Sequence, residues 1–177
     1  MSLSYLLDGY NIIHRLPALA ANKNFEDSRL GLVRLIEVHR PQGSLHNSVT
    51  VVFDGHAGSL GHIETSTVKV VFSQDESADE RIKKIVAQST LKKSMVVVTN
   101  DNDIKFSVRS QGACVMIVEE FLNKMTSGPG EGKQTKRSSP QKEDEKYISQ
   151  THQQNITSEF EKIWLQRFSR RERGNAK

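Results

Sequence analysis

The chain has 177 residues, of which 36% are hydrophobic, and it carries a formal net charge of +4. This length suits one compact domain with appendages and excludes two independent domains of ordinary size. A single cysteine, Cys114, excludes an internal disulfide. No apolar run approaches the ~18 residues of a membrane span, and no secretory pattern opens the sequence, so we expect a cytoplasmic protein with no membrane partner.

Up to about residue 126, short β-rich runs alternate with segments of helical period, which is typical of a parallel sheet covered by crossover helices. We expect strands over residues 4–7, 48–53, 67–72, 94–99 and 113–118. They lack strict alternation, as strands covered on both faces do. Helices are expected over residues 25–40 and 77–89. The fold class is therefore α/β, and Cys114 is interpreted as a core residue of the last strand.

The composition changes after residue 126. Residues 127–146 contain no Val, Ile, Leu or aromatic residue, and we predict a disordered basic linker over residues 127–150. Apolar residues then recur at helical spacing between Ile156 and Phe168, followed by a cluster of arginines, which predicts a C-terminal amphipathic helix over residues 151–177. That helix could pack on the body or bind a partner.

The excess positive charge lies in this tail. Residues 1–126 carry 14 Lys and Arg against 14 Asp and Glu, whereas residues 127–177 carry 11 against 7. A basic tail on a neutral body suits RNA, because cationic side chains displace counterions from phosphates. A tail that only improves solubility is the alternative.

Acidic residues recur where the predicted strands end. Asp8 ends the first strand, Asp54 ends the second, and Asp101 and Asp103 follow the fourth. Asp79 lies in the first turn of the helix after the third strand, on the side that faces the sheet. Because all strand ends of a parallel sheet and the following helix starts share one edge, we expect these acids to lie close together.

Such a cluster needs a compensating charge. Two carboxylates about 4 Å apart repel by roughly 4 kcal/mol at an effective dielectric constant near 20. Oxygen ligands without His or Cys suit Mg²⁺ or Mn²⁺, which activate water for attack on a phosphodiester. Asp8 would then be a metal ligand on a rigid strand. Gly9 would let the chain turn without crowding the site, and Asn11 could orient a ligand, a water or the neighbouring carboxylate.

Each acid also has an ordinary explanation. Ser77 and Glu80 form a capping box, which gives Glu80 a structural role. Asp54 could belong to a plain turn, and Asp101 or Asp103 could cap a helix. Capping does not predict acids at two strand ends as well, so the joint placement favours a site. The six histidines show no zinc-type spacing, and no phosphate-loop or dinucleotide motif is present.

The ordered motifs "LLDGYNII", "VVFDG", "SADERI" and "VVTNDNDI" resemble the YacP-like branch of the NYN domain family, within the PIN-like nuclease superfamily. The resemblance spans about residues 4–125 and implies a three-layer PIN-like, Rossmann-like domain with a central parallel sheet over residues 1–126. It also implies a Mg²⁺- or Mn²⁺-dependent endoribonuclease. RNA would be the partner, with the ribosome as a further one, since this branch includes a ribosome-associated enzyme that cuts messenger RNA in the A site.

Carried over by position, the resemblance implies two sets of site residues. The catalytic, metal-binding acids would be Asp8, Asp79 and Asp101, and the supporting or substrate-binding residues would be Asn11, Asp54 and Asp103. The stretch "TNDNDIK" is closer to the general NYN form than to the S-D-x-x-x-Q of the YacP-like branch. The linker and the terminal helix lie outside the span of the resemblance.

Two other functions remain to be compared with a nuclease. A non-catalytic module of the same fold would bind RNA or a ribosomal surface without cutting. A phosphotransfer or receiver-like domain would also collect acids around Mg²⁺, but it needs a D-x-D or an acidic pair near the start, where this chain has "DGYN". Nothing in the sequence indicates an oligomeric state.

Overall fold

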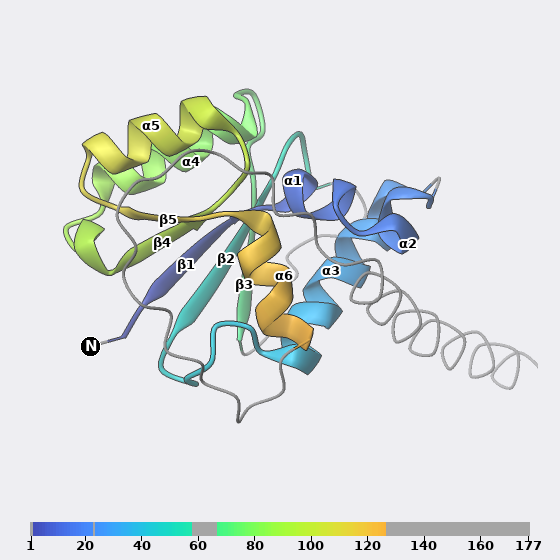
Figure 1. Cartoon of the computed structure of the whole chain (residues 1–177). Coiled ribbons are helices and arrows are strands. Elements are labelled where there is room, and N and C mark those ends of the chain that lie inside the picture. The colour runs from blue at the N-terminus through green and yellow to red at the C-terminus, as the bar shows by residue number, and fades with distance from the viewer. Residues whose placement is uncertain (1, 23, 58–66, 127–177) are drawn as a thin grey trace, which may run out of the picture.

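The structure is a computed structural model that describes residues 2–22, 24–57 and 67–126. Figure 1 shows these residues as one sheet flanked by helices. The linker predicted over residues 127–150 and the helix predicted over residues 151–177 lie outside the described residues.

Within the described residues the strands are β1 Ser4–Asp8, β2 Ser48–Phe53, β3 Val68–Phe72, β4 Met95–Val98 and β5 Cys114–Met116. They form one parallel sheet in the order β3-β2-β1-β4-β5. The predicted strands are confirmed, although β5 is shorter than expected because a helix already begins at Val118. Cys114 lies on this edge strand and is exposed, so its interpretation as a core residue is wrong.

The described helices are α1 Gly9–His14, α2 Pro17–Ala20, α3 Phe25–His39, α4 Ala78–Gln88, α5 Asn102–Ser110 and α6 Val118–Thr126, with a short 3-10 helix η2 at Lys92–Ser94. The two predicted helices are confirmed as α3 and α4. Ser77 caps α4 by accepting a hydrogen bond from the Glu80 backbone N–H at 3.2 Å, as the predicted capping box requires. None of the helices in the described ranges has the length and apolar character needed to cross a bilayer.

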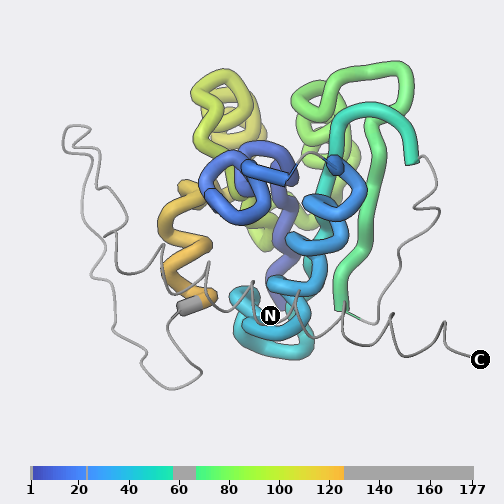
Figure 2. The backbone as a smooth tube through the Cα atoms, turned by 90° about the vertical axis from the view of Figure 1, so that its right-hand side faces the viewer, coloured from blue at the N-terminus to red at the C-terminus, as the bar shows by residue number. Residues whose placement is uncertain are grey.

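The sheet separates two hydrophobic cores. Leu7 and Val98 face one side, where they pack in the cluster that contains the buried residues of α1, α2, α3 and α6. Leu6 and Val97 face the other side and pack with α4 and α5. Successive strand residues alternate between faces, which explains the split. Figures 1 and 2 show α4 and α5 together over one face and α3 and α6 over the other. The architecture is therefore a three-layer α/β domain.

The strand order places a switch point between β1 and β4. The chain leaves β1 through helices on the α3 side of the sheet and leaves β4 through α5 on the opposite side. Between two such neighbouring strands the connections diverge, so a crevice opens at their carboxyl ends, and α/β proteins commonly bind ligands there. The end of β1 is Asp8, and β4 is followed by Thr99 and Asp101.

Candidate active site

Asp8 lies at this switch point, buried and firmly held. Leu7 pairs with Val98 across β1 and β4, so the next residues, Asp8 and Thr99, are neighbours. The Thr99 hydroxyl donates to Asp8 Oδ2 at 3.1 Å. Asn11, in the first turn of α1, donates from its backbone N–H to Asp8 Oδ1 at 3.2 Å and from its side chain to Oδ2 at 3.1 Å. Asn11 therefore orients the neighbouring carboxylate, one of the three roles considered for it.

Asp101 is joined to Asp8 through the same hydroxyl group. The Asp101 backbone N–H donates to Thr99 Oγ1 at 3.1 Å, so the fully buried Thr99 bridges the ends of both strands. Asp101 also caps α5, since its Oδ1 accepts from the backbone N–H groups of Asp103 and Ile104 at 2.7 and 3.1 Å. Within the described part of the chain, Oδ2 of Asp101 accepts no hydrogen bond. One oxygen thus fixes the helix start, and the other is available to a ligand.

Asp79 approaches the pair from α4. It is half-buried in the first turn, with Ile82 and Val86 of the same helix fully buried beneath it. Burial raises the pKa of Asp79, and the negative charges of Asp101 and Asp8 raise it further. The ammonium group of Lys83 acts in the opposite direction. The three acids expected to lie close together therefore do act on one another electrostatically.

The pKa of Asp8 is raised for the same reasons as that of Asp79. Burial raises its pKa above the ordinary value of 3.8, against the hydrogen bonds from Asn11 and Thr99, which lower it, and the charge of Asp101 adds to the increase. An aspartate whose charged form is disfavoured by burial and by a like charge is stabilised by a proton or by a cation. Asp8, only 6% exposed, is the most buried of the three acids.

Asp103 has a different role from the three acids, although its negative charge also raises the pKa of Asp79. Its carboxylate is exposed and forms an ion pair with Lys83 from α4. The hydrogen bond from Lys83 to Asp103 raises the pKa of that ammonium group, so Lys83 stays charged. The helix cap foreseen at Asp101 or Asp103 is made by Asp101. Asp103 thus holds a cation beside Asp79 and ties α5 to α4.

Asp54 is also separate from the three acids. Val52 is the residue of β2 in register with Asp8, so Asp54 lies two positions further along the chain. Its Oδ1 accepts a hydrogen bond from the Ser73 hydroxyl at 2.9 Å, and Ser73 also accepts from the Gly55 backbone N–H at 3.0 Å. These contacts favour the plain-turn interpretation for Asp54, which fastens the end of β2 to the end of β3.

Gly9 is required for a different reason than expected. A Cβ atom on this residue would collide with the Phe53 ring and would lie 2.9 Å from the Val52 carbonyl oxygen. None of the three atoms nearest to it belongs to an acidic residue of the site. The glycine therefore allows the start of α1 to lie against β2, and this close approach holds Asp8 at the helix start.

The donor set fits a hard divalent cation in its chemistry, because the three carboxylates offer only oxygen ligands. In the ranges that the structure describes, no three or more His, Cys, Asp or Glu side chains are already close enough to hold a metal ion. Asp8 is fixed by three hydrogen bonds, whereas the Asp79 carboxylate accepts none from the described residues. Asp79 and the second oxygen of Asp101 are thus the groups that would turn toward a cation.

Sequence reasoning missed Thr99 and Lys83 as members of the site. Thr99 was visible only as part of the stretch "VVTND", and its role depends on β4 pairing with β1, which periodicity cannot show. Lys83 lies four residues after Asp79, the spacing at which side chains meet on one helix face. That spacing was a usable signal for Lys83.

Comparisons with known proteins agree with this fold. The sequence matches the model of the YacP-like NYN domain over residues 5–165. It is similar to a crystal structure of the W164L mutant of Rae1 (YacP) from Bacillus subtilis, with 31% identity and a TM-score of 0.56 over 71% of this chain and 76% of that one. A second structure of Rae1 (YacP) from Bacillus subtilis gives 26% identity and a TM-score of 0.57 over 96% and 85%.

None of the curated proteins compared with the chain matches it. The family match also continues to residue 165, beyond the span of residues 4–125 over which the motifs were recognised. The expectation that the linker and the terminal helix lie outside the family is therefore wrong for most of their length.

Proposed function

We propose that this chain, which belongs to the YacP-like NYN domain family, hydrolyses RNA phosphodiester bonds with the help of Mg²⁺ or Mn²⁺. Its fold is nuclease-like. The observation that supports the proposal most is that Asp8, Asp79 and Asp101 lie at the switch-point edge of the sheet, where the pKa values of Asp8 and Asp79 are raised by burial and by neighbouring negative charge. Asp8, Asp79 and Asp101 would be the metal ligands.

The protein's own residues would prepare the site before RNA binds. Asn11 and Thr99 hold the Asp8 carboxylate in one orientation, so little ordering is left for the reaction step. Asp101 is fixed by its role as a helix cap, and Lys83 keeps positive charge next to Asp79. A bound divalent ion would supply a water of lowered pKa as the nucleophile and would offset the charge of the phosphate.

RNA is the proposed substrate class, and messenger RNA on the ribosome is one form of it. The likeness to the Rae1 (YacP) structures covers most of the described body. A comparison of free RNA with translating ribosomes as substrates distinguishes the two forms. Cleavage of both at equal rates would assign no special role to the ribosome.

One observation favours a second function, an RNA-binding module that does not cut. As the described side chains stand, no set of three potential ligands is close enough for a metal ion. A module of this kind would keep the fold and its RNA affinity without needing the carboxylates to converge. The two functions differ in turnover, which the next experiment measures.

The test is Mn²⁺-dependent cleavage of fluorescent single-stranded and structured RNA by the full chain and its variants. Asp8→Asn and Asp101→Asn should each abolish cleavage while leaving salt-sensitive RNA binding in place, because asparagine keeps the helix caps but lacks the charge. Asp75→Asn is the matched control, since Asp75 has a 97% exposed side chain in the loop before α4. A wild-type chain that binds RNA but cuts none of these substrates favours the binding module.

A further inference from the structure

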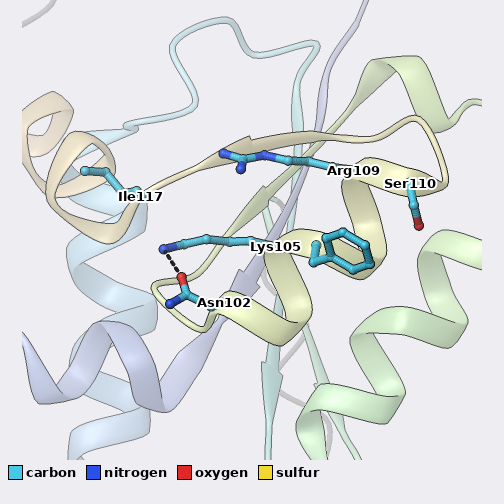
Figure 3. Close-up of a pocket in the computed structure, with 6 residues that line it drawn as sticks. Asn102, Lys105, Arg109, Ser110 and Ile117 are labelled. Carbon is cyan, nitrogen blue, oxygen red and sulfur yellow. Dashed lines mark hydrogen bonds between the residues drawn. The ribbon is translucent and has the colours of Figure 1, made fainter. Parts of the chain in front are cut away.

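The outward face of α5 combines positive charge with an exposed ring. Ile104 and Val108 point into the core and are fully buried. On the other side, Lys105, Phe106 and Arg109 line an open pocket of about 770 Å³, together with Asn102, Ser110 and Ile117. Figure 3 shows the side chains of Lys105 and Arg109 extending in the same direction from α5, toward Ile117. We call this surface the α5 face.

The cationic groups of the α5 face form no ion pair with the described residues. Lys105 donates a hydrogen bond to Asn102 Oδ1 at 3.2 Å, and neither Lys105 nor Arg109 has a carboxylate partner among residues 2–22, 24–57 and 67–126. The nearby acid of the same helix, Asp103, is paired with Lys83. The body as a whole is neutral, so two cations that lack such partners one turn apart make a local positive surface.

Phe106 adds an apolar platform beside these cations, in the lining of the same pocket. Its side chain is 77% exposed, and it lies next to Lys105 in sequence and three residues before Arg109. An exposed ring beside cationic groups is the arrangement on which proteins stack an unpaired base while they contact the adjacent phosphates. Bases of a duplex are already stacked on one another, so the same ring offers much less to double-stranded RNA.

The α5 face begins at the proposed catalytic site. Asp101 caps α5 and Asn102 is its first residue, and each further residue rises about 1.5 Å along the helix axis. Arg109 therefore lies roughly 12 Å along the axis from Asp101. A strand that reaches the acids at the helix start can run along the same helix without leaving the surface.

We propose that the α5 face binds the single-stranded RNA that flanks the scissile bond, with an unpaired base on Phe106 and phosphates on Lys105 and Arg109. This inference rests on the proposed nuclease function, because it takes the acids at the start of α5 as the point of cleavage. Charge complementarity selects RNA over an apolar protein segment as the occupant. The α5 face thus explains how a neutral body holds its substrate.

The charge part is tested by the salt dependence of binding. Fluorescence anisotropy of a labelled oligouridine would be measured in EDTA with the full-length chain and with the double variant Lys105→Gln/Arg109→Gln. The slope of log K against log salt should decrease by roughly 1.4, because each phosphate contact of a single strand contributes about 0.7. Lys92→Gln/Lys93→Gln, in η2 directly before β4, makes the same charge change outside the residues that line the α5 face and should leave the slope unchanged. Equal slopes in the two double variants would overturn the proposal.

The stacking part is tested with Phe106→Ala. Affinity for oligouridine should decrease about fivefold or more, and affinity for a duplex of equal length should stay near the wild-type value. Leu91→Ala removes another exposed apolar side chain, 69% exposed, next to η2, and should change neither affinity. A loss of equal size for both RNA forms, or no loss for the single strand, contradicts the role of Phe106.

The outcomes also separate this inference from the nuclease proposal. If no protein cuts RNA but the α5 variants still lose affinity, the nuclease proposal fails and the α5 face stands. If the wild type cuts RNA and the α5 variants bind and cut as well as it does, the α5 face is wrong and the nuclease proposal stands.

Discussion

Thr99 connects Asp8 at the end of β1 with Asp101 at the start of α5. Its hydroxyl donates to Asp8 and accepts from the Asp101 backbone N–H, and no part of it reaches solvent. A buried hydroxyl that serves as donor and acceptor fixes the distance between the groups on either side. The Thr99 hydroxyl therefore fixes the position of Asp8 relative to Asp101.

Thr99→Val should damage both stability and activity. The variant keeps the shape but leaves the Asp101 N–H and one bond of Asp8 unmatched, so unfolding in urea should be easier by about 1–3 kcal/mol. RNA cleavage should decrease about 10- to 100-fold, the usual effect of losing a group that orients a metal ligand. Thr99→Ser keeps the hydroxyl and is the matched control. It should retain most of the wild-type stability and most of the cleavage rate. Cleavage at the wild-type rate by Thr99→Val would mean that the bridge does not position the acids.

Asp79 gives a prediction about pH. Its pKa is raised above the ordinary value of 3.8 in the folded chain, so the folded state binds this proton more tightly than the unfolded state does. The contribution of Asp79 therefore becomes destabilising as the pH rises above 3.8, with the slope that proton linkage requires. Without divalent metal, Asp79→Asn should be more stable than the wild type at neutral pH, and the difference should disappear below that pH.

Urea denaturation across this pH range measures the effect, with Glu80→Gln as the control from the same turn of α4. Adding Mn²⁺ should reverse the order at neutral pH, because a ligand that binds only the folded wild type stabilises it. A stability difference that does not change with pH would show that the folded state does not disfavour the charged form of Asp79.

The types of the site residues could be predicted from the sequence better than their contacts. The acids at the ends of the strands and at the start of α4 followed from the α/β pattern alone. The separation of Asp54 did not, because it depends on β2 extending past the level of Asp8 and on the hydroxyl of Ser73, which follows β3. Thr99 stayed hidden for the same reason, since a long-range strand pairing creates its role.

Among the helices and strands, the start of α1 determines how the Asp8 side chain is oriented. α1 follows β1 without a loop, and Asp8 is both the last residue of the strand and the cap of the helix. The sequence indicated that the first strand ends at Asp8, but α1 and α2 were not predicted, because helices of six and four residues are too short to show a helical period. The close approach of Gly9 to Phe53 makes this abrupt change of direction possible.

Gly9→Ala should therefore destabilise the fold. The added methyl group would meet the Phe53 ring and the Val52 carbonyl oxygen, and overpacking of this kind costs about 1–3 kcal/mol. Urea denaturation gives the loss directly. In the double variant Gly9→Ala/Phe53→Leu the loss should be smaller than the sum of the single losses, because the two sites share one contact. If the losses of stability simply added, the added methyl group would not be destabilising through its contact with Phe53.

The order of the strands was also beyond the sequence. Periodicity indicated the strands and two of the helices, but the order β3-β2-β1-β4-β5 follows from which crossovers pack on which face. That order creates the switch point between β1 and β4, and so it determines which of the predicted acids become neighbours. The edge of the sheet that carries the acids could be predicted from the sequence. The switch point between β1 and β4 on that edge could not.

Across the molecule as a whole, the proposed catalytic site and the proposed RNA-binding surface carry opposite charges. The acids are concentrated at one end of the β1–β4 pair, and the described cations of the α5 face lie beside them. The sequence assigned RNA attraction to the basic tail, and the structure adds a second positive surface on the neutral body. An anionic substrate can then approach an acidic site from a neighbouring positive one.

The central claim is that Asp8, Asp79 and Asp101 converge on one divalent ion. Anomalous scattering from crystals of the full chain soaked in Mn²⁺ tests it most directly. We expect a manganese peak at about 2.1 Å from an oxygen of Asp8 and from at least one of the other two acids, the distance typical of a small hard cation. Crystals that take up manganese elsewhere, with the three carboxylates still apart and no peak between them, would contradict it.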